Sequence, residues 1–119
     1  MTQQYHQLNQ DIGGNLASLR SGIPQVMEGF GAMVKAANVE GTLDSKTKEL
    51  IALVLGVAMR CDPCTGFHTK ALVDLGVTEA EIQEMLGVAI YMGGGPSMMH
   101  AANAMTAFNE FSEAKAVNS

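Results

Sequence analysis

Apolar residues recur along much of this chain every three to four positions, which is the spacing of one face of an α-helix. A clear case follows Ile23 and Pro24, where the apolar stripe is formed by Val26, Phe30, Met33 and Val34. No segment alternates apolar with polar residues over the length that a β-strand needs. The pattern therefore predicts an all-α fold, a helical bundle of about six helices.

Helix-terminal residues predict where the first three helices begin and end. A short amphipathic helix is expected over residues 11–19, and a second is expected from Pro24, whose fixed φ suits a first helical turn. Gly41 is expected to end this second helical region. Asp44 can cap a third helix, which runs to about Met59, because its carboxylate accepts unpaired amide hydrogens of the first turn.

The remaining three helices are bounded by similar signals. The fourth is expected to begin around Cys61 and to end before Gly76, a residue suited to a left-handed cap. Thr78 and Glu81 form a capping box that starts the fifth helix. The glycines at 93–95 end it, and Pro96 stands at the start of a last helix that fades near residue 117.

The third predicted helix is apolar on all sides over residues 50–59. Such a helix has to be covered on all sides, whereas a domain of this size buries only ~60–70% of its unfolded surface. We therefore expect the chain to oligomerise through its apolar helices.

Composition narrows the class of protein. The 119 residues fit a single domain over 1–119, with its core at about 22–112, and 47% hydrophobic against 16% charged residues argues for a folded chain. No apolar run reaches the ~20 residues of a membrane span, and the amino terminus lacks signal-peptide character, so a cytoplasmic protein is expected. A net charge of −5 without basic clusters argues against nucleic-acid or membrane partners.

The chemistry of the chain is concentrated in the segment from Cys61 to His68, CDPCTGFH. Two cysteines three residues apart at a helix start bring their Cα atoms within the ~4.4–6.8 Å that a disulfide requires. The helix amino terminus favours thiolate over thiol, and Pro63 pre-organises the first turn. His68 follows Cys64 by four residues and shares its helical face, so its imidazole can exchange a proton with that thiol.

Two other interpretations of the cysteine pair stay open on these residues alone: half of a zinc site, and inert buried thiols. Zinc needs four ligands, and His68 lies ~10 Å beyond Cys61 along a helix axis, too far for both to reach one ion. His6 and His100 are the other histidines, and no second Cys-x-x-Cys is present. The zinc interpretation is therefore weaker than the redox one.

Glu49, Cys61, Cys64 and His68 together form Glu-x11-Cys-x2-Cys-x3-His. This motif resembles that of the alkylhydroperoxidase D branch of the carboxymuconolactone decarboxylase family, and the likeness extends over roughly residues 42–108. The resemblance implies an all-helical fold, trimers or hexamers, and neither a metal nor an organic cofactor, since the redox-active group is the Cys61–Cys64 disulfide itself.

The resemblance also implies a role for each residue. Cys64 is the nucleophile that attacks a peroxide or disulfide substrate, Cys61 resolves the sulfenate, and Glu49 orients or recharges His68. Electrons come from a thiol or dithiol donor, which includes donor proteins. Pro63 stands where the best-known pattern has a further relay histidine, so a thiol–disulfide reductase is nearly as well supported as a peroxidase.

Two further alternatives differ in class. The decarboxylation that gives the family its name does not call for a redox cysteine pair, so it is the more remote. In a non-catalytic oligomeric module, methionines would pack a subunit interface, as methionines at helical spacing commonly do. The residues concerned are Met92, Met98, Met99 and Met105.

Overall fold

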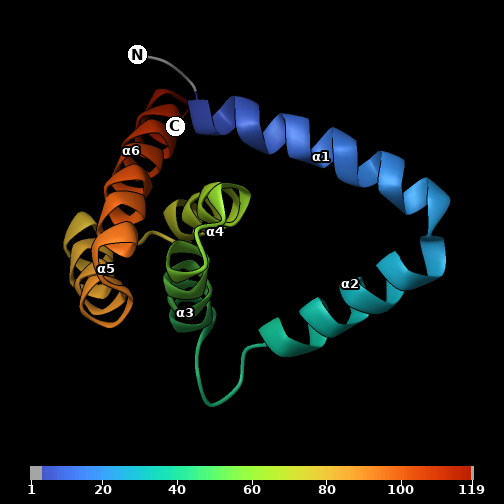
Figure 1. The fold of residues 1–119 in the computed structure, drawn as a ribbon, viewed down its shortest axis with the longest axis horizontal. Coiled ribbons are helices and arrows are strands. Elements are labelled where there is room, and N and C mark those ends of the chain that lie inside the picture. Colours follow the sequence, from blue (N-terminus) through green and yellow to red (C-terminus); the bar gives the residue numbers. More distant parts are fainter. Residues whose placement is uncertain (1–3, 119) are drawn as a thin grey trace.

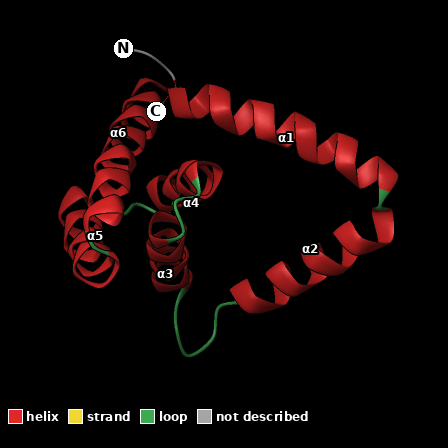
Figure 2. Ribbon diagram, in the orientation of Figure 1, coloured by secondary structure: helices red, strands yellow, loops and turns green. Residues whose placement is uncertain are grey.

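The computed structural model describes residues 4–118, and six helices account for nearly all of them (Figure 2). They are α1 (Gln4–Gly22), α2 (Pro24–Asn38), α3 (Ser45–Ala58), α4 (Asp62–Asp74), α5 (Glu79–Gly93) and α6 (Gly95–Asn118). No strand occurs within this described range. The all-α class predicted from the hydrophobic pattern is confirmed.

The helix ends follow the cap residues of the sequence. The Asp44 carboxylate accepts the Thr47 N–H at 2.8 Å, which lowers the pKa of that carboxyl group and fixes the start of α3. The capping box of Thr78 and Glu81 is fully formed at the start of α5. Gly76, after α4, adopts the left-handed conformation at φ 83° that a side chain would oppose.

Helix α1 is longer than the expected 11–19, because its start is fixed from the other end of the chain. The Glu110 carboxylate on α6 is buried and accepts the backbone N–H groups of Tyr5 and His6, each at 2.9 Å. These are unpaired amides of the first helical turn. This start could not be predicted from the neighbouring residues, since the capping residue lies more than 100 residues away in the sequence.

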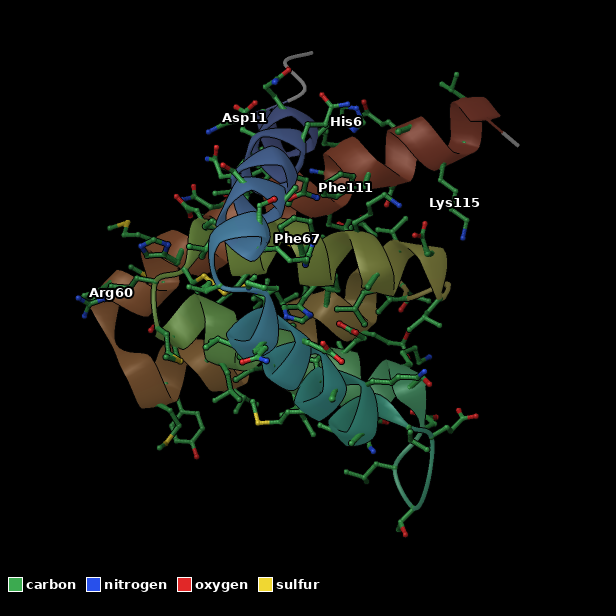
Figure 3. The ribbon with its side chains drawn as sticks, turned by 90° about the vertical axis from the view of Figure 1, so that its right-hand side faces the viewer. His6, Asp11, Arg60, Phe67, Phe111 and Lys115 are labelled. Carbon is green, nitrogen blue, oxygen red and sulfur yellow. A yellow bond between two sulfur atoms is a disulfide. The ribbon has the colours of Figure 1, made fainter. Side chains whose placement is uncertain are left out.

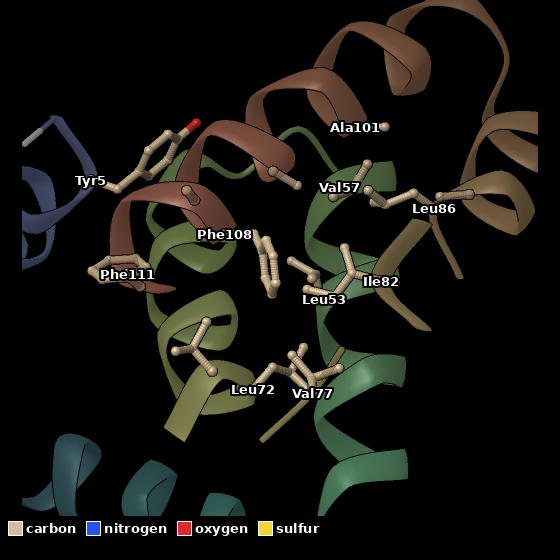
Figure 4. Packing of buried hydrophobic residues seen from close by; sticks show 14 residues of the cluster. Tyr5, Leu53, Val57, Leu72, Val77, Ile82, Leu86, Ala101, Phe108 and Phe111 are labelled. Atoms are coloured by element: carbon tan, nitrogen blue, oxygen red, sulfur yellow. The ribbon is translucent and has the colours of Figure 1, made fainter. Parts of the chain in front are cut away.

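The core lies among α3, α4, α5 and α6, with the start of α1 packed beside it (Figure 4). Leu53 from α3, Leu72 from α4 and Ile82 from α5 are fully buried, and Phe108 from α6 packs among them. Tyr5 brings α1 onto the edge of this cluster. The two cysteines at the start of α4 are thus attached to this packed core.

One side of α3 is not covered by the chain itself. Leu53 and Val57 are buried, but Leu55 is 54% exposed and Met59 is 76% exposed. Met92, Met98 and Met99 are exposed as well, and Met105 is partly buried. Residues 50–59 are thus apolar on all sides of the helix but are not buried on all sides within one chain.

Helices α1 and α2 leave the bundle as an angled arm, joined at a corner near Ile23 (Figure 1). Their far ends lie well away from α5 and α6, and no residue of α2 is buried. None of the described helices is both long and apolar enough to cross a membrane.

Candidate functional site

The two cysteines are joined in a disulfide at the start of α4, with their Cα atoms 5.2 Å apart. This separation falls within the window that the sequence spacing predicted. Both residues are partly buried, so the bond is neither locked into the core nor fully open to solvent. A thiol–disulfide reaction can reach it without unfolding the chain.

The local backbone explains why the pair sits at a helix start. Cys61 is the N-cap residue of α4, and its Sγ accepts the Cys64 N–H at 3.2 Å. Pro63 lies in the first turn, where no amide hydrogen is needed. Arg60, just before the pair, has a left-handed φ of 58°, a conformation that costs a side-chain-bearing residue energy. Figure 3 shows its side chain extending away from the bundle.

Glu49 and His68 meet directly, although they belong to different helices. Nδ1 of His68 on α4 lies 2.7 Å from Oε2 of Glu49 on α3. Both side chains are partly buried, the glutamate more than the histidine. A carboxylate at Nδ1 favours the tautomer that carries its proton there, which leaves Nε2 as the basic nitrogen. The structure thus brings together Glu49 and His68, two residues of the sequence motif, in direct contact.

A pocket of about 350 Å³ opens beside the disulfide. Cys61, Cys64 and His68 line one part of it, and α3 supplies an apolar wall of Ala52, Leu55, Gly56 and Met59. This wall did not appear among the residues predicted from sequence, since nothing in an apolar stretch marks which face will border a cavity. It places an apolar surface beside the two sulfurs.

Gly56 on α3 lies directly against the second cysteine of the pair. A Cβ built on it would lie 2.9 Å from Cβ of Cys64, closer than real Cβ contacts allow. The glycine therefore permits α4 to approach α3 at the height of the disulfide. A larger residue would displace the second cysteine from its place.

We expect Gly56→Ala to lower the free energy of unfolding by ~1–3 kcal/mol, the cost of overpacking, and to slow closure of the disulfide. Gly14→Ala is the matched control, because Gly14 is also inside a helix but has nothing within 4 Å of its added Cβ. Denaturant unfolding and thiol-oxidation rates measure both effects. Equal stability and equal closure rates in the two variants would contradict this role.

A second set of ionisable residues lies on the α1 and α6 side of the pair. His100 on α6 has its Nδ1 3.6 Å from Oδ1 of Asp62, the residue after Cys61. Burial, with the nearby charges of Asp62 and Glu110, raises the pKa of Tyr5 to about 12. His100 and the exposed Tyr91 do not line the disulfide pocket. Among the described residues, no three His, Cys, Asp or Glu side chains are grouped to hold a metal ion.

The sequence pattern of the carboxymuconolactone decarboxylase family matches residues 24–107, which include Glu49 and both cysteines. The chain belongs to this family. The family assignment made from the motif is thus confirmed, and this chain has the helical fold that the resemblance implied.

Several relatives of this carboxymuconolactone decarboxylase family member are similar over most of their length. A solved structure of a family protein from Legionella pneumophila shares 49% identity, with a TM-score of 0.91 over 93% of this chain and 99% of that one. One from Thermotoga maritima shares 33% identity, with a TM-score of 0.72 over 76% and 94%. An uncharacterized protein of Cupriavidus necator is 36% identical over 83% of this chain and 88% of its own.

Proposed function

We propose that this family member is a thiol-dependent peroxidase or disulfide reductase that works through the Cys61–Cys64 pair. The observation that carries the proposal is a disulfide facing one pocket together with His68, whose Nδ1 is held 2.7 Å from Glu49. A disulfide, an imidazole held by a carboxylate and a pocket lie at one place, which supports a redox reaction with proton transfer. An antioxidative role has been suggested for the Thermotoga maritima relative, which agrees with this proposal.

In the peroxidase reaction, the Cys64 thiolate attacks the terminal oxygen of a hydroperoxide and the O–O bond breaks. The cysteine becomes a sulfenic acid, and the leaving alkoxide takes a proton from His68 to form the alcohol. The Cys61 thiolate then attacks the sulfenic sulfur, which closes the disulfide and, with one proton, releases water. A dithiol donor restores both cysteines and is itself oxidised to a disulfide.

The helix start gives Cys61 a part in each half of this cycle. Its Sγ accepts the Cys64 N–H, an interaction that favours negative charge on that sulfur. In the oxidative half, this makes Cys61 ready to resolve the sulfenic acid. In the reductive half, a donor thiolate that attacks Cys64 expels Cys61 as the stabilised leaving thiolate.

The disulfide reductase reaction uses the same two sulfurs and differs in the oxidant. The reduced pair then transfers its electrons to a substrate disulfide, and no sulfenic acid forms. Pro63, at the position where the best-known pattern has another histidine, is the residue that favours this second function. In both cases the apolar wall of α3 favours a substrate with an apolar group beside its reacting atoms.

The proposal extends to the setting of the enzyme. The chain would act as a homo-oligomer, a trimer or hexamer by resemblance, in the cytoplasm, where thiol donors keep the pair cycling. The decarboxylase, zinc-binding and non-catalytic alternatives each lack a use for a disulfide that faces a pocket.

Intact mass spectrometry with metal analysis of the same sample tests the redox pair. We expect fully reduced protein to lose about 2 Da on treatment with a small excess of peroxide, and to regain them with a dithiol. The sample should contain no stoichiometric zinc. Zinc at one equivalent per chain, or cysteines that both peroxide and a small disulfide leave unchanged, would contradict the proposal; oxidation by the small disulfide alone would favour the reductase.

A further inference from the structure

Helix α2 carries an apolar face that its own chain leaves open. Val26 is 65% exposed and Phe30 is 59% exposed, and Met33 and Val34 continue the same face. Glu28 and Lys35 lie on the opposite side of the helix by the 3.6-residue period. The face is therefore a continuous apolar stripe without charge.

Such a helix is not expected to persist by itself. It has 15 residues, and isolated helices of that length are marginal in water. Gly29 and Gly31 in its interior weaken it further. The rest of the chain contacts α2 mainly at its carboxyl end. There Nζ of Lys48 donates to the carbonyl oxygens of Ala37 and Val39 at 2.9 and 2.6 Å. The apolar stripe needs a covering surface.

The chain also carries an apolar groove, between α3 and α5, with a volume of about 380 Å³. Apart from Thr47, its lining is entirely apolar: Leu50, Ile51, Val54, Leu55, Met85 and Val88. Ile51, Leu55 and Val88 are each about half exposed. An apolar helix face can be buried there without removing any charge from water.

The size of the molecule indicates how much surface is left uncovered. The chain exposes 7424 Å², whereas a monomer of 12.6 kDa is expected to expose about 6,200 Å². Its radius of gyration of 14.7 Å likewise exceeds the ~13.5 Å expected for a domain of this length. The excess of about 1,200 Å² is larger than the ~800 Å² that each partner buries in a standard interface.

We propose that the α2 stripe of one copy packs into the α3–α5 groove of a second copy of this chain. Each molecule carries both the stripe and the groove, so a second copy supplies a groove for the stripe and a stripe for the groove. Helix α2 does not reach the groove of its own chain. From the Lys48 contacts at its carboxyl end, the helix extends away from the bundle (Figure 1).

This contact also bears on the redox pocket, a consequence that rests on the proposed function. Leu55 lines both the groove and the pocket beside the disulfide. An arm seated in the groove of its neighbour therefore borders the pocket through Leu55. Association would shield one side of the apolar wall from water and so favour binding of an apolar substrate.

Sedimentation equilibrium of the full chain over a range of concentrations tests the contact. We expect wild type to associate, and Phe30→Glu on the stripe and Val88→Glu in the groove each to raise the dissociation constant at least ~10-fold, because each buries a charge in an apolar contact. Gln25→Glu adds the same charge on the polar side of α2 and should associate as wild type does. The measurement uses Cys64→Ser protein as well, so its outcome is independent of redox activity.

Mixing the two variants gives a sharper test. Phe30→Glu keeps an intact groove and Val88→Glu keeps an intact arm, so the mixture should form heteromers under conditions where each variant alone is dissociated. Amide exchange of residues 24–38 should be slow in associated wild type and fast on dilution. A wild-type monomer, unchanged association of Phe30→Glu or Val88→Glu, an equal loss in Gln25→Glu, or a mixture that stays dissociated would each overturn the proposal.

Discussion

In Cys61→Ser, peroxide is expected to convert Cys64 to a sulfenic acid that persists, because the sulfur that would resolve it is gone. Dimedone should then label close to one equivalent per chain, and turnover should stop after a single cycle. The expectation rests on His68, which lines the pocket with Cys64 and stands four residues after it on the same helix. Mass spectrometry of the dimedone adduct measures it.

Cys64→Ser is the matched variant, with the same side-chain exchange at the other end of the disulfide. Its remaining Cys61 is expected to react slowly with peroxide, because it lies seven residues from His68. The opposing influence is the Cys64 N–H that Cys61 accepts at the helix start. If Cys64→Ser gave the adduct and Cys61→Ser did not, the order of attack would be reversed, and a disulfide reductase that attacks through Cys61 would be favoured.

Glu49→Gln is expected to slow oxidation of the thiol pair by roughly 10–100-fold, the range that proton-relay groups contribute. The amide keeps the shape of the side chain but cannot carry the negative charge that faces Nδ1 of His68 at 2.7 Å. The imidazole then loses the carboxylate that holds its proton at Nδ1. Stopped-flow oxidation of the reduced protein measures the rate.

The control for this change is Glu84→Gln, which removes a charge from an exposed position on α5. It should leave both the rate and the thermal transition as in wild type. The transition of Glu49→Gln should also be close to that of wild type, since the residue acts through His68. Oxidation rates that are equal in the two variants would show that Glu49 takes no part in the oxidation.

Where helix boundaries are local, the sequence was enough to place them. Asp44 and the pair of Thr78 and Glu81 contact amides within three residues of themselves, so their caps could be predicted from spacing. The start of α1 could not, because its amides bond to Glu110 on the last helix. The extent of burial along α3 was also out of reach, since it depends on which helices pack against it.

The same division holds for the site. The spacing of Cys61, Cys64 and His68 along one helix fixes their relation, so that part could be predicted from chain geometry. Glu49 was connected to His68 only through the family motif, because the contact joins two helices. The close approach at Gly56 carried no signal in sequence, since a glycine within an apolar helix does not indicate which neighbour requires it.

Steady-state turnover tests the central claim most directly, that the Cys61–Cys64 pair is a catalytic redox centre. Wild-type protein would be supplied with an excess of a dithiol donor and either an alkyl hydroperoxide or a small disulfide. We predict that at least one of these oxidants is consumed over many equivalents per chain, and that Cys64→Ser abolishes this consumption. A single stoichiometric oxidation of the pair, with no further consumption of either oxidant, would contradict the account.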